Sequence, residues 1–270
     1  MVNRNDHAAA VSKVARVYNF LAQFGEGGAA SDYLHVGLFD GENDELAAAQ
    51  DRLVREISRK LQIGGQSHLV DIGCGVGRPM IEISRHFGCR VTGITIAEVQ
   101  AAQARELIAR NTLDARVRAI VADAHRLPFA TGAFDGAIAL ESLLHMNRAT
   151  ALGEIGRVVR PGGSFVLCDF YELQPLTNKE IKALERQMCM NTVNLAQYRD
   201  LLSAAGFSNP KVVDWTSAVL PTYVHWSRFK TDPGSPTPPN FIARYNAIAS
   251  SILPIIGARL GYLCISATRA

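Results

Sequence analysis

The chain has 270 residues, of which 48% are hydrophobic and 20% are charged. This fits one large α/β domain, or a core with a smaller lid. The net charge of +3 and the lack of a Lys/Arg-rich block argue against nucleic acid as a partner. We recognise no membrane span and no signal peptide. The five cysteines include no Cys-x-x-Cys pair, so we expect reduced thiols in a cytoplasmic protein, without a disulfide frame or a zinc site.

Two helices are expected ahead of the core. Residues 11–24 have an amphipathic pattern and precede a soft linker at 25–31. Leu53 and Leu61 lie on one face of a second helix that leads into the sheet. We expect residues 1–62 to form a helical segment that covers the functional site.

From residue 69 onward, short apolar runs alternate with helical patterns, which indicates a parallel sheet with helices on both faces. The expected strands are 69–72, 90–94, 117–122, 135–140 and 164–169. Helices are expected over 98–110 and 149–159. The run Pro161-Gly162-Gly163 should end the second of these helices before the fifth strand.

The last third of the chain has a weaker pattern. A helix is expected near 195–205, a sixth strand at 211–215, and a seventh at 262–268 that pairs antiparallel at the sheet edge. The prediction is therefore a seven-stranded, mostly parallel α/β sheet. Its core consists of residues 63–215 and 259–270.

An insertion over residues 216–258 separates the last two expected strands, and segments of this length usually have a function. It contains a Pro-rich run at 232–239 and the aromatic residues Tyr223, Trp226, Phe229 and Tyr245. We expect a helical lid that binds the substrate. A helical satellite that only packs on the core is the alternative.

Three glycines at alternate positions, Gly73, Gly75 and Gly77, follow the first expected strand, and a helix is expected from Pro79. We call these three residues the glycine turn. Without Cβ atoms the backbone can lie against a bulky cofactor, and the helix start offers unpaired N–H groups. A dinucleotide fold requires a third glycine where this chain has Arg78. The spacing therefore favours a cofactor other than NAD.

Acidic residues end two of the expected strands. Asp71 lies just before the glycine turn, where it can reach an ammonium group or hydroxyls. Asp123 and Ala124 end the third strand, and ligands of open α/β sheets bind beyond the carboxyl ends of the strands. A carboxylate followed by a backbone N–H at this place can bind an adenine ring, although an ordinary polar loop is the alternative for Asp123 alone.

The motifs together resemble those of class I S-adenosylmethionine (SAM)-dependent methyltransferases, over residues 66–170. The resemblance rests on the glycine turn, Asp123, Phe134-Asp135-Gly136, Leu140-Glu141-Ser142 and Arg160-Pro161-Gly162-Gly163. Tyr33-Leu34-His35-Val36-Gly37 and the run over 139–146 are similar to small-molecule methyltransferases of natural-product pathways, of the rebeccamycin sugar O-methyltransferase type. The resemblance implies a Rossmann-like fold, SAM as the methyl donor and S-adenosylhomocysteine as the product, with no metal.

The cofactor residues that the resemblance implies are Asp71, Gly73, Gly75, Gly77, Thr95, Ile96, Gln100, Asp123, Ala124, Leu140 and Glu141. One departure is Thr95, which stands where most members have an acid for the ribose hydroxyls. Cyclopropane-synthase relatives have a similar threonine, so we assign the ribose contact to Gln100, with Thr95 and Ile96 beside it. Glu98 is expected to face solvent from the first helical turn.

The rebeccamycin-type relatives have two adjacent histidines and an aspartate that act on the substrate proton. This chain keeps His145 and Asp169, and Leu144 replaces the first histidine. We expect His145 to be the general base and Asp169 to orient it. The alternative is that His145 only shapes the substrate wall. Tyr18 is a third catalytic candidate, because it could close over the methyl group from the N-terminal helix; a simple core tyrosine is the alternative.

The expected substrate residues are His35, Leu144, Tyr223 and Trp226, whereas His68, His86 and His125 are expected at the surface or behind the site. The predicted activity is methyl transfer to a small, largely apolar molecule, most directly to a hydroxyl oxygen. Methylation of a prenyl or indole carbon with or without cyclisation, N-methylation, and SAM binding without transfer are the alternatives. The partner is a small molecule, with neither nucleic acid nor membrane, and the chain is compatible with a homo-oligomer.

Overall fold

The computed structural model describes residues 4–24, 35–41, 44–228 and 239–270. The expected linker at 25–31, Phe229 and nearly all of the Pro-rich run lie outside these ranges, as does the side chain of Tyr245. No helix in the described ranges is both long and apolar enough to cross a membrane.

The described residues form one seven-stranded sheet with the order β3-β2-β1-β4-β5-β7-β6. Its strands are β1 (His68–Ile72), β2 (Arg90–Thr95), β3 (Val117–Val121), β4 (Phe134–Leu140), β5 (Val159–Glu172), β6 (Phe207–Asp214) and β7 (Leu260–Arg269). The pairs among β1 to β5 are parallel, and β7 pairs antiparallel with both β5 and β6. The expected α/β sheet and the antiparallel pairing of its seventh strand are confirmed. Strand β7 lies between β5 and β6, however, so β6 and not β7 is the edge strand.

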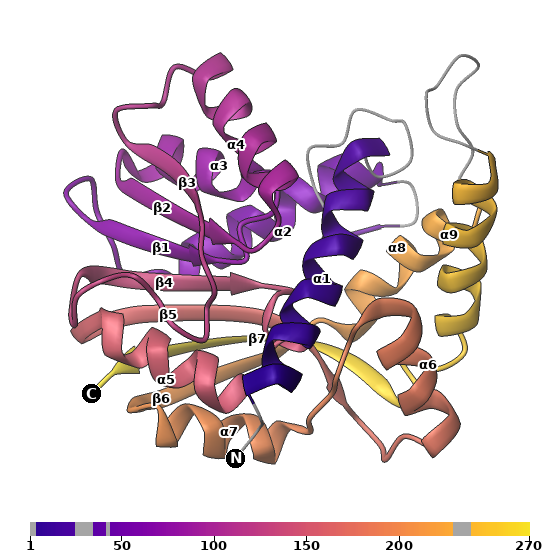
Figure 1. Cartoon of the computed structure of the whole chain (residues 1–270). Coiled ribbons are helices and arrows are strands. Elements are labelled where there is room, and N and C mark those ends of the chain that lie inside the picture. The colour runs from indigo at the N-terminus through magenta and orange to yellow at the C-terminus, as the bar shows by residue number, and fades with distance from the viewer. Residues whose placement is uncertain (1–3, 25–34, 42–43, 229–238) are drawn as a thin grey trace.

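Helices lie on both faces of this sheet (Figure 1). They are α1 (Arg4–Phe24), α2 (Leu46–Lys60), α3 (Arg78–Phe87), α4 (Glu98–Arg110), α5 (Arg148–Val158), α6 (Asn178–Met188), α7 (Leu195–Ala204), α8 (Thr216–Ser227) and α9 (Pro239–Ile252), with a short 3-10 turn η1 (Leu143–His145). The inserted segment between β6 and β7 thus contains α8 and α9. Helix α3 begins one residue earlier than expected.

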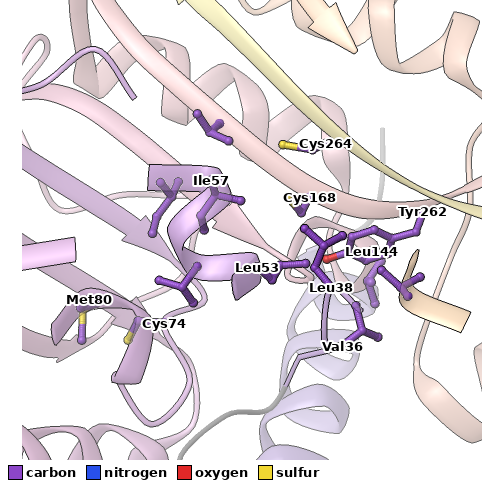
Figure 2. Packing of buried hydrophobic residues seen from close by; sticks show 14 of the residues in the cluster. Val36, Leu38, Leu53, Ile57, Cys74, Met80, Leu144, Cys168, Tyr262 and Cys264 are labelled. Atoms are coloured by element: carbon purple, nitrogen blue, oxygen red, sulfur yellow. The ribbon is translucent and has the colours of Figure 1, made fainter. Parts of the chain in front are cut away.

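Alternation along the strands divides the core into two clusters. Leu69 belongs to one cluster and its neighbour Val70 to the other, because successive strand residues point to opposite faces. Helices α2, α3 and α8 pack in the first cluster, and α5 and α7 in the second. Figure 2 shows the first, where Leu53 and Ile57 of α2 face Cys168 of β5. The predicted apolar face of α2 is therefore confirmed.

Further details differ from the sequence expectation, and one is that β6 begins at Phe207 and not at 211. Strand β5 begins at Val159 and not at 164, with an irregular register opposite β4 where the Pro-Gly-Gly run lies. Helix α6 was not expected. Thr177 and Glu180 form a reciprocal capping box at its start, a pattern that is visible in the sequence as Thr-x-x-Glu.

Candidate active site

The glycine turn lies between β1 and α3 in a backbone conformation that other residues rarely adopt. Gly73, Gly75 and Gly77 have φ values of 79°, 53° and 92°. A Cβ atom on Gly73 would lie 2.4 Å from Cβ of Ser142. The N–H groups of Gly73 and Cys74 both bond to the carbonyl of Ile94, each at 2.9 Å. The turn is therefore fixed to β2 and leaves its backbone bare toward the space above it.

A cavity opens at this turn and encloses about 970 Å³, part of it open to solvent. The residues that line it come from α1, the segment before α2, the strand ends with the loops after them, and the first turns of α3 and α4. They are Val11, Val14, Tyr18, His35, Asp71, Gly73, Cys74, Gly75, Val76, Pro79, Ile94, Thr95, Ile96, Gln100, Ala122, Asp123, Ala124, His125, Leu140, Glu141, Ser142, His145 and Met146. Most of the residues predicted from sequence thus share one cavity. Gly77 supports the turn from outside this lining.

Asp71 lies at the end of β1 with only 2% of its surface exposed. Burial raises the pKa of its carboxyl group to about 7, because the charged form loses its hydration. A cationic ligand in the cavity would compensate this loss. The position and the charge of Asp71 therefore suit an ammonium group.

Thr95 and Gln100 form a polar pair on the same wall. The Thr95 hydroxyl donates to Oε1 of Gln100 at 3.0 Å and accepts from the N–H of Ala97 at 3.2 Å. The amide nitrogen of Gln100 is buried, and none of the described residues accepts a hydrogen bond from it. A buried amide donor in this position needs an acceptor from a ligand. A ribose hydroxyl would supply one.

Asp123 is held in place by the residue two positions later. Its Oδ1 accepts from the N–H of His125 at 2.9 Å and from Nδ1–H of His125 at 2.6 Å. Nε2 of His125 in turn accepts from the N–H of Asn147 at 2.9 Å. His125, expected at the surface or behind the site, lines the cavity and orients Asp123 beside Ala124.

His145 and Tyr18 meet inside the cavity. The Tyr18 hydroxyl lies 2.6 Å from Nε2 of His145, and Nδ1 of His145 lies 3.1 Å from the carbonyl of Cys189. A carbonyl only accepts hydrogen bonds, so Nδ1 carries the proton and Nε2 accepts from Tyr18. Burial, together with the nearby charge of Arg148, lowers the pKa of His145 to about 4, against the opposing effect of the hydrogen bond to Cys189. The imidazole is therefore neutral at physiological pH.

Asp169 does not orient His145 directly as the sequence suggested. Its Oδ2 accepts hydrogen bonds from Tyr198 and, at 3.4 Å, from Arg148, and its Oδ1 accepts from the N–H of Phe170. Arg148 of α5 donates to the carboxylate of Asp169, and the imidazole N–H of His145 donates to the backbone carbonyl of Cys189. Asp169 is almost completely buried, which raises the pKa of its carboxyl group.

The opposite wall contains two further titratable side chains. Nδ1–H of His35 donates to the carbonyl of Val36 at 2.8 Å, and burial lowers the pKa of His35 to about 4. Oε1 of Glu141 accepts from the N–H of Val36 at 3.0 Å and from the Tyr262 hydroxyl at 2.9 Å. Burial raises the pKa of Glu141 to about 8. At neutral pH both groups are therefore uncharged.

Three residues expected in the substrate pocket lie elsewhere. Leu144, Tyr223 and Trp226 belong to the first hydrophobic cluster and do not line this cavity. Tyr223 makes edge-to-face contacts with both Phe170 and Trp226. These side chains support the cavity from behind.

Helix α1 lies across the carboxyl ends of the strands (Figure 1) and contributes Val11, Val14 and Tyr18 to the cavity. Asn19 accepts a hydrogen bond from the N–H of Val99 at 3.0 Å. Gln103 of α4 donates to the α1 carbonyl of Ala22 at 2.7 Å, and Lys13 donates to the α6 carbonyl of Glu185 at 3.2 Å. The helix thus bridges α4 and α6.

Comparison with known proteins agrees with this geometry. Residues 70–167 match the family described as a methyltransferase domain. The chain is 35% identical over 188 residues to O-methyltransferase cnsE from Penicillium expansum, covering 68% of this chain and 67% of that protein. It is 32% identical over 198 residues to (+)-O-methylkolavelool synthase from Herpetosiphon aurantiacus, covering 72% and 70%. The chain therefore belongs to the class I SAM-dependent methyltransferases, among those that act in natural-product biosynthesis.

Solved structures share the fold at lower identity. The [4+2]-cyclase SpnF has a TM-score of 0.84 at 24% identity, with 96% of each chain covered. Geranyl diphosphate C-methyltransferase from Streptomyces coelicolor A3(2), solved with Mg2+, geranyl diphosphate and S-adenosyl-L-homocysteine, has a TM-score of 0.77 at 21% identity, covering 97% and 98%. Proteins of this fold therefore carry out different reactions.

Proposed function

We propose that this enzyme transfers a methyl group from SAM to a hydroxyl oxygen of a small, uncharged and largely apolar acceptor. The observation that carries the proposal is the contact between Tyr18 and neutral His145 inside the cavity. In this contact the lone pair on Nε2 of His145 faces the Tyr18 hydroxyl and can accept its proton. Helix α1 and His35, both from the N-terminal 62 residues, would lie over the acceptor, whereas no described residue of the inserted segment 216–258 lines the cavity.

The cavity has the groups that SAM requires. Asp71 would hold the ammonium, Gln100 with Thr95 and Ile96 the ribose, and Asp123 with the N–H of Ala124 the adenine. The glycine turn would lie against the methionine part, and Leu140 and Glu141 would close the wall near the sulfur. Bound SAM supplies a methyl group activated by its positive sulfonium. Two observations support the fit of SAM to this cavity: the buried amide of Gln100, and the tight glycine turn at Gly73, where a Cβ atom would not fit.

The protein's part in the transfer is to orient the acceptor, exclude water and accept one proton. We propose that the hydroxyl proton passes to the oxygen of Tyr18 while the phenol proton passes to Nε2 of His145. A base with a low pKa is sufficient, because the acceptor oxygen becomes strongly acidic as its new bond to carbon forms. Nδ1 keeps its proton throughout, since it donates to Cys189.

The charge of the cavity favours an uncharged acceptor. None of the described residues that line it is a lysine or an arginine. Its acidic side chains are Asp71, Asp123 and Glu141, of which Glu141 is uncharged at neutral pH. A phosphate or diphosphate would be buried there without a cationic partner, which is costly. The relatives named for O-methylation support transfer to oxygen.

The experiment is product identification. The purified enzyme is incubated with methyl-labelled SAM and a panel of phenols, terpene alcohols, hydroxylated macrolactones, amines and prenylated indoles. Each free alcohol is paired with its phosphate ester, which tests the charge argument. We expect an O-methyl ether from a free alcohol and at least a hundredfold lower kcat/KM for its phosphate. A carbon–methyl or nitrogen–methyl product, or tight SAM binding with no transfer to any compound, would contradict the proposal.

A further inference from the structure

Asn191 bonds to the residues on both sides of the proposed proton acceptor. Its backbone N–H donates to the carbonyl of Leu144 at 2.9 Å, and its side-chain Nδ2 donates to the carbonyl of Met146 at 3.3 Å. His145 lies between these two residues in the chain. One asparagine thus fixes the backbone on either side of the imidazole.

The same segment provides the carbonyl that determines the tautomer of His145. Cys189 ends α6 with a φ of 53°, and its N–H bonds back to the carbonyl of Leu184. A non-glycine residue persists in this conformation only where its surroundings hold it there. Its carbonyl, two residues before Asn191, accepts from Nδ1–H of His145. The direction of this carbonyl therefore depends on how the segment after α6 is held.

Arg148 holds Asn191 from the other side. One guanidinium nitrogen donates to Oδ1 of Asn191 and another donates to its backbone carbonyl at 3.0 Å. The arginine is buried, with 4% of its surface exposed, and it also contacts Asp169 and the hydroxyl of Tyr198. A buried arginine has one preferred position when its charge is paired and its guanidinium nitrogens all donate hydrogen bonds to fixed acceptors.

We propose that Asn191, held by Arg148, is a positioning residue that sets the tautomer and the orientation of His145. This inference rests on the proposed function in one respect: methyl transfer to a hydroxyl is what gives His145 a proton to accept. The two tautomers of a neutral imidazole exchange freely unless a neighbour selects one. With Nδ1–H committed to Cys189, Nε2 presents its lone pair to Tyr18. The opposite tautomer could not accept the Tyr18 proton.

The test reads the tautomer directly, without a substrate. Two-bond 1H–15N NMR spectra of 15N-histidine-labelled enzyme distinguish Nδ1–H from Nε2–H, and loss of a signal in His145→Gln assigns the residue. We expect a single Nδ1–H form in the wild-type enzyme and a mixture of both forms in Asn191→Ala. With an accepted substrate, kcat of Asn191→Ala should fall at least tenfold while the Kd for SAM changes less than twofold.

Asn194→Ala is the matched control. Asn194 lies three residues further on, and its Oδ1 caps α7 by accepting from the N–H of Gln197 at 2.9 Å. Its loss should lower the Tm but leave the tautomer unchanged and kcat within twofold. Arg148→Lys is a second variant that keeps a positive charge beside Asp169 but loses the fork on Asn191. It should shift the tautomer in the same direction, and it decides the question if Asn191→Ala does not fold.

A single, unchanged Nδ1–H form in a folded Asn191→Ala or Arg148→Lys protein would overturn the inference, whatever the activity. A shifted tautomer with unchanged kcat would support the positioning role and instead contradict His145 as the proton acceptor. The two proposals can therefore fail separately.

Discussion

The phenol oxygen of Tyr18 lies 2.6 Å from Nε2 of His145, although the two residues are 127 positions apart. One comes from helix α1 and the other from the 3-10 turn after β4. The helix that covers the cavity therefore also supplies half of the proposed proton path.

Removing either member of this pair should slow methyl transfer. We expect His145→Gln and Tyr18→Phe each to lower the single-turnover rate by about 10²–10⁴-fold, the usual contribution of a positioned acid or base. The Kd for SAM should change only a few-fold. The double variant should be little slower than either single one, because both act on the same proton.

His86→Gln is the control for these variants, because His86 is exposed on α3. It should keep the wild-type rate. If Tyr18→Phe also keeps that rate while His145→Gln does not, the proton reaches His145 without the phenol. If both keep it, neither residue moves the proton.

The rate should be insensitive to pH near neutrality. Burial and then the charge of Arg148 lower the pKa of His145 from 6.5 to about 4, against the opposing hydrogen bond to Cys189. The active form is the unprotonated one, so activity is full above this value and is lost as the pH falls through it. Single-turnover rates at saturating SAM should agree within about twofold between pH 6 and 8. A midpoint near 6.5 would contradict the assignment of a buried, neutral imidazole.

Affinity for SAM should rise with pH through the titration of Asp71. Burial raises the pKa of this carboxyl group to about 7, and only its ionised form attracts the ammonium. The Kd should therefore fall roughly 20-fold between pH 5.5 and 7.5, while the α-amino group of SAM stays mostly protonated. Calorimetric titration would measure it. Asp71→Asn should bind SAM weakly and show no such dependence, and equal slopes in both proteins would refute the assignment.

The same carboxyl group should destabilise the ligand-free protein. Its folded pKa of about 7 lies above the ordinary value of 3.8 for an aspartate, so stability is lost as the pH rises through the interval between them. Ionised Asp71 costs on the order of 4 kcal/mol at most by pH 8, since each pKa unit corresponds to about 1.4 kcal/mol. Asp71→Asn should therefore raise the Tm of the ligand-free protein at pH 8 and change it little at pH 4. A lower Tm at pH 8 would contradict this.

Two glycine-to-alanine changes should have opposite effects. Gly73→Ala places a Cβ 2.4 Å from that of Ser142 at a φ of 79°, so we expect a loss of at least about 1–2 kcal/mol and of SAM binding. At Gly153, inside α5, a Cβ would meet nothing within 4 Å. Gly153→Ala should stabilise the fold by about 0.5–1 kcal/mol and leave SAM binding intact. Thermal unfolding with and without SAM compares them.

The sequence was sufficient to predict the sheet and to predict which strand-end residues share one cavity. Parallel strands bring their carboxyl ends to one edge, so residues at those ends, such as Asp71 and Asp123, had to share a site. The hydrogen-bond partners of the site residues were harder to predict. The partner of Nδ1 of His145 is a backbone carbonyl 44 residues away, and a carbonyl leaves no mark in the residue types. Arg148, which donates a hydrogen bond to the carboxylate of Asp169, lies one residue before the helix expected over 149–159 and was not predicted to belong to the site.

The aromatic residues of the inserted segment illustrate the other limit. Tyr223 and Trp226 could equally face a substrate or the core by composition. Their burial was decided by what packs against them, and Phe170 of β5 meets the ring of Tyr223. In the case of α6, by contrast, the signal was present, because Thr177 and Glu180 have the spacing of a capping box.

The anchoring of α1 has a kinetic consequence. Lys13, Asn19 and Ala22 each tie the helix to a neighbouring element through a hydrogen bond, and these bonds hold it over the cavity. If S-adenosylhomocysteine leaves past this helix, these hydrogen bonds must open first. Rearrangements of this kind often take microseconds to milliseconds and can limit turnover. We therefore expect a burst of methylated product in the first cycle, followed by a slower steady state whose rate is set by the residence time of S-adenosylhomocysteine.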